Sequence, residues 1–286
     1  MTMHCLIYKS HNLLTLICTS TGPLCLPLSA VEPATITRYT SAGRKIRNWA
    51  ADMGVPLLQL TVFMLLSFFA DLMLAGYSYT TANHVRSYLA MVFHLALCTP
   101  ITDDPLIRMT LRGYKRATAA WIRRRDPICK HLVARIRHWI ATHLFGEFAL
   151  ECLAAIDCLY DGLMRRMEVF SLEARDLSID PRGIRVFIAR SKTDPMGMGA
   201  EALVTPGHHL RQLWASRTGK LFLYLNPNLL LSLIKDILPS GNYVLHSFRH
   251  GKATDLFRAG WNLWDIATRG RWRTIAALRL YLHRCG

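Results

Sequence analysis

The stretch from His246 to Tyr281 constrains the fold of this chain more than any other. His246 and Arg249 are three residues apart, so on a helix they share a face and their donors can converge on one anion. Trp272 and Tyr281 are nine residues apart, and on one unbroken helix, at about 100° per residue, they would face opposite sides. The chain must therefore turn between Trp272 and Tyr281 if both side chains are to reach one site.

The residues between Trp272 and Tyr281 carry the signals of such a turn. Thr274 is a good N-cap, and the pattern after it predicts a short helix over residues 275–283. Trp272 would precede this helix and Tyr281 would lie near its end. The buried side of the helix would carry Ile275, Leu278 and Leu282. A cationic cradle beside a tyrosine hydroxyl supplies what attack on a phosphodiester needs, namely donors for developing charge and a nucleophile.

These features resemble the C-terminal signature of the tyrosine recombinase (phage integrase) family. They are His-x-x-Arg from His246, a Gly-Arg-Trp corner ending at Trp272, and a tyrosine nine residues after that tryptophan. Ala253-Thr254-Asp255-Leu256 and Gly260 fit the same signature. Many members have His where Trp272 stands, and Trp is a known variant. The resemblance covers roughly residues 34–286.

The resemblance implies transesterification without a metal or another cofactor. Tyr281 would attack a DNA phosphate and form a 3′-phosphotyrosine, which keeps the bond energy for resealing. Arg249 would contact non-bridging phosphate oxygens. His246 and Trp272 would add hydrogen bonds, and His246 would assist removal of the tyrosine proton.

A second motif supplies another arginine. The segment 162–168, Gly-Leu-Met-Arg-Arg-Met-Glu, is similar to the family's first arginine motif, Gly-Leu-Arg-x-x-Glu. Met164 stands where the family usually has Arg directly after Leu. Counting back three residues from Glu168 selects Arg165 as the catalytic arginine, and Arg166 remains the alternative. Glu168 at this spacing can orient the guanidinium.

A change from helical to alternating periodicity predicts a β-hairpin. Residues 184–188 alternate as one strand, and residues 202–204 form the return strand after a Gly-containing turn. Lys192 stands in that turn, where the family carries a lysine that protonates the leaving 5′-oxygen. Lys220 is the weaker alternative for this role.

Residues 34–95 are predicted to be helices of an N-terminal domain. Thr35 or Thr37 can cap the first helix. The apolar stretch 57–74 is near membrane-spanning length, but its polar residues fall at helical spacing, which favours a buried helix. The layout resembles the core-binding domain of the same family, including a Gly-Tyr-Ser turn at residues 76–78.

The charge of the chain favours a polyanion as its partner. Lys and Arg number 35 against 19 Asp and Glu, a formal net charge of +16. A basic run at residues 108–125 lies between the two predicted DNA-binding domains, where its cations would contact phosphate. The residues expected to bind DNA are Arg112, Lys115, Arg116, Arg123 and Arg124.

The chain is predicted to be mainly α with a small antiparallel β-sheet, an α+β fold. Residues 1–30 would be a disordered extension, residues 31–125 a helical core-binding domain with its basic linker, and residues 126–286 the catalytic domain. The eight cysteines include no Cys-x-x-Cys pair, so we interpret them as reduced thiols of an intracellular protein. The protein would be nuclear in a eukaryote and cytoplasmic in a bacterium.

The predicted function is site-specific recombination or integration of double-stranded DNA by a mobile-element enzyme. It would act as a homo-tetramer on paired DNA sites, with no membrane partner. Only five residues follow Tyr281, too few for the C-terminal helix with which many family members dock into a neighbouring subunit, so the free protein is expected to be a monomer. Two alternatives stay open, a DNA-relaxing enzyme like the type IB topoisomerases and a non-catalytic DNA-binding remnant of a mobile element.

Overall fold

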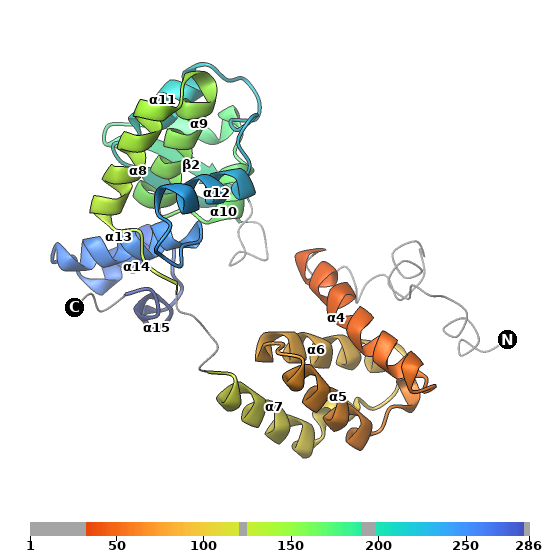
Figure 1. Cartoon of the computed structure of the whole chain (residues 1–286). Helices are drawn as coiled ribbons and strands as arrows, with labels where there is room; N and C mark the ends of the chain where they lie inside the picture. The colour runs from red at the N-terminus through yellow and green to blue at the C-terminus, as the bar shows by residue number, and fades with distance from the viewer. Residues whose placement is uncertain (1–32, 120–124, 190–197, 283–286) are drawn as a thin grey trace. The chain divides into compact units, whose positions relative to one another are not determined.

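A computed structural model describes residues 33–119, 125–189 and 198–282 (Figure 1). The chain divides into two compact units, residues 1–123 and residues 124–286. The first unit is helical, and the second combines helices with a three-stranded sheet. The predicted fold, mainly α with a small antiparallel sheet, is confirmed.

The first unit packs its helices around one apolar core. Along the chain its described elements are α4 (Pro33–Asp52), η1 (Leu57–Gln59), α5 (Val62–Leu74), α6 (Tyr79–Leu95), η2 (Ile101–Asp103) and α7 (Pro105–Ala117). α4 packs on α6, and α5 packs on α7. The core residues that these helices bury completely include Ile46, Leu65, Phe69, Leu89 and Ile107.

The helix ends of the first unit differ from the sequence prediction. α4 begins at Pro33, so Thr35 and Thr37 lie inside the helix and the predicted caps are wrong. The predicted long apolar helix is a 3-10 turn followed by α5, which Thr61 caps by accepting a hydrogen bond from the backbone N–H of Met64. Within the described ranges, no helix is long and apolar enough to cross a membrane.

The second unit surrounds its sheet with helices. It begins with α8 (Lys130–His143), α9 (Gly146–Ile156), the π-helical turn η4 (Asp157–Asp161), α10 (Arg166–Phe170) and η5 (Ala174–Asp176). The strands are β1 (Leu177–Asp180), β2 (Gly183–Ile188) and β3 (Ala200–Val204). The remaining helices are α11 (His208–Ala215), α12 (Pro227–Ile237), α13 (His246–Arg258), α14 (Leu263–Gly270) and α15 (Ile275–Arg279).

The sheet has the order β1-β2-β3, with both pairs antiparallel. Val186 pairs with Leu177 on one side and with Ala202 on the other. Along β2 the buried residues alternate with exposed Arg185 and Phe187, which is the period of a strand with one face on the core. The two predicted strands are confirmed, whereas β1, which has only four residues, was missed.

Two apolar clusters hold the second unit together. The larger lies between α8, α9, the sheet, α11 and α12. A smaller one fixes the C-terminal helices α13, α14 and α15 against one another, which Figure 1 shows side by side at one end of the unit. Its fully buried members are Leu163, Ala253, Ile266 and Leu278. Trp261 and Trp264, which we expect from the sequence in the core or at an interface, are 41% and 73% exposed, so they do not belong to the core.

The cysteines that the structure describes are free thiols, as predicted. Burial raises the pKa of Cys129 to about 11 and that of Cys152 to about 12. Because the thiolate is the reactive form of cysteine, these buried thiols have a structural role. The cysteines outside the described residues are Cys5, Cys18, Cys25 and Cys285.

Candidate active site

Helix α13 presents the predicted histidine and arginine from its first turn. It begins at His246, and Arg249 follows three residues later. Gly251 brings this helix against the chain that enters α8, since a Cβ at this position would lie 1.8 Å from the carbonyl oxygen of Ile128. Only glycine permits so close an approach. The position of the first turn of α13 is thereby set by local packing.

The corner between α14 and α15 brings Trp272 and Tyr281 together. Trp272 folds back onto Gly270, where a Cβ would lie 1.6 Å from the indole ring. Thr274 caps α15 by accepting a hydrogen bond from the backbone N–H of Ala277 at 3.1 Å, as predicted. The rings of Trp272 and Tyr281 meet edge to face, with centroids 5.1 Å apart. The predicted turn between these two residues is confirmed, but the helix ends at Arg279, so Tyr281 lies just beyond it and not within a helix over residues 275–283.

The Tyr281 hydroxyl lies beside His246. The His246 Nε2 atom is 2.8 Å from the hydroxyl oxygen. Burial, reinforced by the charges of Arg249 and Arg165, lowers the pKa of His246 to about 4. The imidazole is therefore neutral at pH 7, and a neutral imidazole can accept a proton from the tyrosine. The ring of His250 packs on the same tyrosine, with centroids 4.4 Å apart.

Arg249 lies beneath Trp272. Only 1% of Arg249 is exposed, and its guanidinium carbon is 4.1 Å from the centroid of the indole ring. Its terminal nitrogens donate hydrogen bonds to the backbone carbonyls of Leu163 and Gly270. Burial and the nearby charges of Arg165 and Arg271 lower the pKa of Arg249 to about 9. The guanidinium still carries its charge at neutral pH.

Arg165 and Arg271 share one carboxylate. Glu168 Oε1 accepts a hydrogen bond from Arg165 Nη1 at 2.7 Å, and Oε2 accepts one from Arg271 Nη2 at 2.6 Å. Burial by itself would raise the pKa of Glu168, but the charge of Arg271 and the hydrogen bonds and charge of Arg165 lower it below its ordinary value. Arg166 is exposed, so the geometry favours Arg165 of the two alternatives.

Several buried donors of this cluster lack a partner among the described residues. They are Nε of Arg249, Nε and Nη1 of Arg271, and Nε1 of Trp272. Buried donors in folded proteins are almost always hydrogen-bonded. Within the described parts of the chain the ionic groups are also unbalanced, because the guanidiniums of Arg165, Arg249 and Arg271 gather around the one carboxylate of Glu168. The arrangement fits an oxyanion that accepts from these donors.

Known proteins resemble this chain in part of its sequence and in its fold. No family model matches the sequence. One curated protein, an integrase/recombinase XerD homolog of Selenomonas ruminantium, is 28% identical over 104 residues. That match covers 35% of this chain, and the chain spans 29% of the length of that relative.

Solved structures match over nearly the whole chain. The Tn1549 transposon integrase in complex with transposon right end DNA superposes with a TM-score of 0.64 at 15% identity, covering 90% of this chain and 91% of that one. The XerH site-specific recombinase bound to its difH substrate gives 0.65 at 15% identity, covering 90% and 78%. A lambda integrase dimer bound to a core site gives 0.63 at 14% identity, covering 100% and 97%.

The chain has the tyrosine recombinase fold.

Within this tyrosine recombinase fold, the structure brings five of the six predicted catalytic residues into one cluster. They are Arg165, His246, Arg249, Trp272 and Tyr281. The sixth, Lys192, lies outside the described residues, between the end of β2 at Ile188 and the start of β3 at Ala200. The alternative lysine, Lys220, is exposed, and its backbone pairs with that of Glu173.

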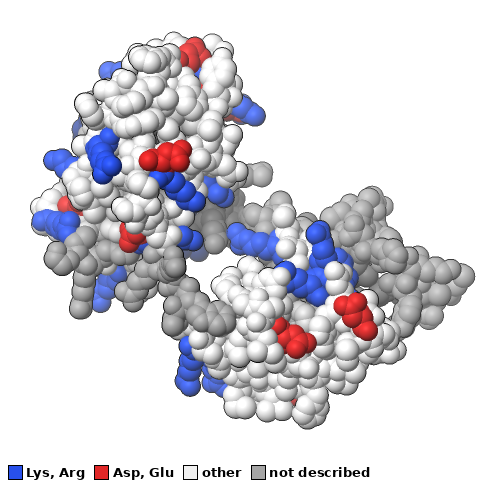
Figure 2. All heavy atoms as spheres, in the orientation of Figure 1, with Lys and Arg blue, Asp and Glu red and all other residues white. Residues whose placement is uncertain are grey.

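The predicted DNA-binding cations that the structure describes lie on α7. Arg112, Lys115 and Arg116 are exposed on this helix, whereas Arg123 and Arg124 lie outside the described residues. Figure 2 shows more Lys and Arg than Asp and Glu on the visible face of each unit. Between α6 and α7 there is a cavity of about 410 Å³, lined by Tyr79, Asn83, Arg86, Arg108, Leu111, Arg112 and Lys115.

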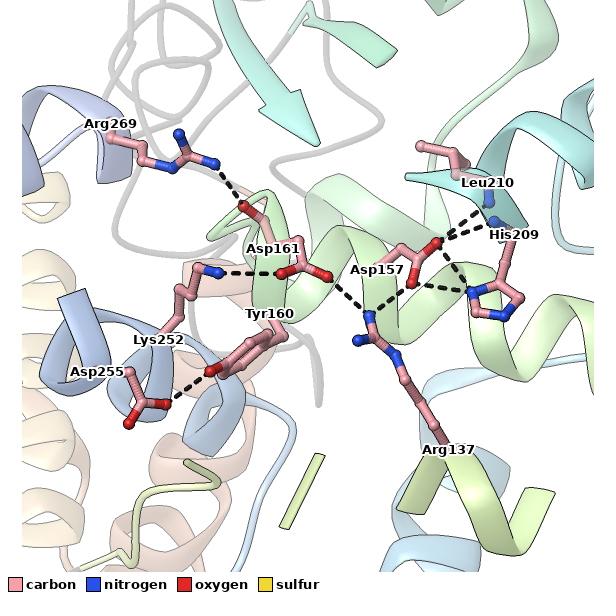
Figure 3. A network of polar contacts seen from close by, with 9 residues as sticks. All are labelled: Arg137, Asp157, Tyr160, Asp161, His209, Leu210, Lys252, Asp255 and Arg269. Atoms are coloured by element: carbon pink, nitrogen blue, oxygen red, sulfur yellow. Dashed lines mark hydrogen bonds and ion pairs between the residues drawn. The ribbon is translucent and has the colours of Figure 1, made fainter. Parts of the chain in front are cut away.

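One group of side chains has the composition of a metal site but fits a metal poorly. Asp157, His208 and His209 bring three candidate ligand atoms within 4.8 Å of one another. The Asp157 carboxylate is already bound by Arg137 at 2.6 Å, and it accepts hydrogen bonds from the backbone N–H groups of His209 and Leu210 (Figure 3). A metal ion there would compete with a guanidinium. The carboxylate instead caps α11.

Sequence reasoning missed Arg271. This residue formed part of the Gly-Arg-Trp corner but was used only for its spacing. Its partner Glu168 lies 103 residues earlier in the sequence, so local patterns do not show the contact. A signal was nonetheless present, because an arginine in a corner next to a glycine is an unusual choice for a turn.

Proposed function

We propose that this chain is a DNA strand transferase that cuts and rejoins DNA through a covalent tyrosine intermediate. One observation carries the proposal. The hydroxyl of Tyr281 lies 2.8 Å from Nε2 of a neutral His246, beside a cluster of guanidiniums with unpartnered donors. A nucleophile, a base and an oxyanion site are the components of attack on a phosphodiester.

The proposed step proceeds in this way. His246 accepts the phenolic proton, and the Tyr281 oxygen forms a bond to phosphorus. The bond from phosphorus to the 5′-oxygen breaks, which leaves a 3′-phosphotyrosine and a 5′-hydroxyl. Arg165, Arg249 and the indole N–H of Trp272 stabilise the charge on the non-bridging oxygens. Lys192 donates the proton that the leaving oxygen needs, and the reverse reaction rejoins a strand.

Double-stranded DNA is the proposed substrate. The net charge of +16 and the exposed cations of α7 favour binding to the phosphate backbone. The Tn1549 integrase, XerH and lambda integrase structures were all solved with DNA. By analogy, residues 31–125 would form the core-binding domain and residues 126–286 the catalytic domain. We further propose a mobile-element origin and a homo-tetramer that assembles on paired DNA sites.

Trapping of the covalent intermediate tests this function. Nicked duplexes that lose the 5′-hydroxyl fragment after cleavage would be made from the DNA that flanks the gene. The wild type should form an adduct that survives denaturing electrophoresis, and Tyr281→Phe should form none. Tyr224→Phe is the matched control, since Tyr224 is 59% exposed and lies outside the cluster. An adduct of equal yield in Tyr281→Phe would overturn the proposal, as would its absence in the wild type.

A further inference from the structure

Arg271 adopts a backbone conformation that is unfavourable for residues other than glycine. Its φ is 57°, in the left-handed region that favours glycine. It follows the last residue of α14, and its N–H donates to the carbonyl of Thr268 at 3.1 Å. Glycine is the common residue at such a helix end. Strained backbone at a non-glycine residue often marks a functional site, which raises the question of what the arginine side chain does here.

The backbone strain of the second unit gathers around Arg249. Among the described residues of this unit, the non-glycine positions with positive φ are Leu163 and Arg271. The carbonyl of Leu163 accepts a hydrogen bond from Arg249. The charge of Arg271 is one of the causes that lower the pKa of Arg249, after burial and Arg165. Both strained residues therefore interact with the Arg249 guanidinium, Leu163 through its carbonyl and Arg271 through its charge.

Only some of the hydrogen-bond donors of the Arg271 side chain have partners among the described residues. It is 11% exposed, and one nitrogen, Nη2, is bound to Glu168. Nε and Nη1 are buried and have no hydrogen-bond partner among the described residues. A residue kept only for the ion pair with Glu168 would leave two donors unsatisfied, which costs stability. Nε and Nη1 lie on different edges of the guanidinium, so each can donate to a separate acceptor while Nη2 stays on Glu168.

We propose that Arg271 is a further phosphate-binding residue of the candidate active site. One of its two unpartnered donors, Nε or Nη1, donates to a non-bridging oxygen of the phosphate that Tyr281 attacks, while Nη2 stays on Glu168. Glu168 then links Arg271 to Arg165, so that the two guanidiniums are held in a fixed relation. The inference rests on the proposed function and adds a third guanidinium to its oxyanion site.

A neutral phosphate analogue separates this role from a structural one. In a methylphosphonate, one non-bridging oxygen is replaced by a methyl group and the charge is lost. Arg271→Gly relieves the backbone strain and removes the guanidinium. With the ordinary phosphate, this variant should cleave nicked duplex about 10²-fold more slowly than the wild type at saturating DNA. With the methylphosphonate at the cleavage site, the two rates should differ by less than about threefold.

Each result has a distinct meaning. An equal loss on both substrates would overturn the inference, because it would show that Arg271 acts only by supporting the fold. An unchanged rate on the ordinary phosphate would overturn it too. If Arg271→Gly does not fold, Arg271→Lys keeps the charge beside Glu168 but lacks the further donors of the guanidinium, and it should lose about tenfold or more on the ordinary phosphate alone. Arg175→Gln, with its side chain 80% exposed, controls for loss of one positive charge. No adduct in the wild type would instead overturn the proposed function, and this inference with it.

Discussion

Two clusters of charged side chains each include one residue of helix α13, and they differ in their balance of positive and negative charge. In the first, Arg137 Nη2 lies 2.6 Å from Asp157 and 2.7 Å from Asp161 (Figure 3). Lys252 Nζ lies 3.0 Å from Asp161. Two carboxylates thus meet two cations, and we call these four residues the balanced cluster. Its members tie α8, the turn η4 and α13 together.

The second cluster, which we call the unbalanced cluster, consists of Arg165, Glu168, Arg249 and Arg271. Three guanidiniums meet one carboxylate, and three guanidinium nitrogens lack a partner among the described residues. In the network around the balanced cluster, the buried nitrogens without a partner among the described residues are Nε of Arg137 and Nε of Arg269. Buried charge is stable only when it is compensated. The comparison indicates that the balanced cluster stabilises the fold, and we propose that an anion from outside completes the unbalanced cluster.

The largest effect is expected from breaking the balanced cluster. Arg137→Ala leaves Asp157 and Asp161, which are 1% and 4% exposed, without their shared partner. The free energy of unfolding should fall by about 3–5 kcal/mol, as for other broken buried ion pairs. Urea denaturation measures this. Arg175→Ala, at the surface, should change it by less than about 0.5 kcal/mol. A similar small change in Arg137→Ala would show that the balanced cluster does not hold the fold.

Removal of a cation from the unbalanced cluster should affect chemistry more than stability. Arg165→Gln should slow cleavage of nicked duplex by about 10²-fold, because an oxyanion donor is lost. Arg166→Gln is the matched control, since this neighbour is exposed, and its rate should change by less than about threefold. Single-turnover rates at saturating DNA give both values. The opposite ranking would assign the catalytic role to Arg166.

Removal of the only carboxylate makes the imbalance worse. Glu168→Gln removes the carboxylate that Arg165 and Arg271 share, and the free energy of unfolding should fall by about 2 kcal/mol. Bound DNA supplies the missing negative charge, so a short duplex should raise the melting temperature of this variant more than that of the parent. Thermal unfolding in the Tyr281→Phe background avoids covalent trapping. Equal stabilisation of variant and parent would argue against an anion in this cluster.

The smallest effect concerns the titration of His246. Its pKa of about 4 lies below the ordinary 6.5, so the unfolded chain takes up this proton first. The contribution to stability is therefore complete above about pH 6.5 and is lost as the pH falls towards 4. His246→Gln, which cannot titrate, should flatten this part of the stability profile. A bound phosphate opposes the field of the arginines, so NMR titration should show a higher pKa in the DNA complex. A midpoint near 6.5 in the free protein would contradict the burial argument.

Local patterns predicted those parts of the site that depend on nearby residues. The N-cap at Thr274, the short helix after it and the turn between Trp272 and Tyr281 all follow from residues within a few positions. The alternation along β2 likewise predicted a strand, whereas β1 is too short for its period to be seen.

What could not be predicted depends on contacts between distant residues. The burial of Arg249 under Trp272 and the pairing of Arg271 with Glu168 arise only when α10, α13 and the corner after α14 come together. The exposure of Trp261 and Trp264 could not be predicted for a related reason. Aromatic residues suggest a core, but only the packing of α14 decides which of its faces stays exposed.

The central claim is that Tyr281 is the nucleophile served by the unbalanced cluster. Mass spectrometry of the trapped protein–DNA adduct, after digestion with protease and nuclease, tests this claim most directly. The account predicts that the residual 3′-nucleotide is attached through phosphate to the oxygen of Tyr281. Attachment to any other residue, or no adduct with a substrate that the protein binds, would contradict it.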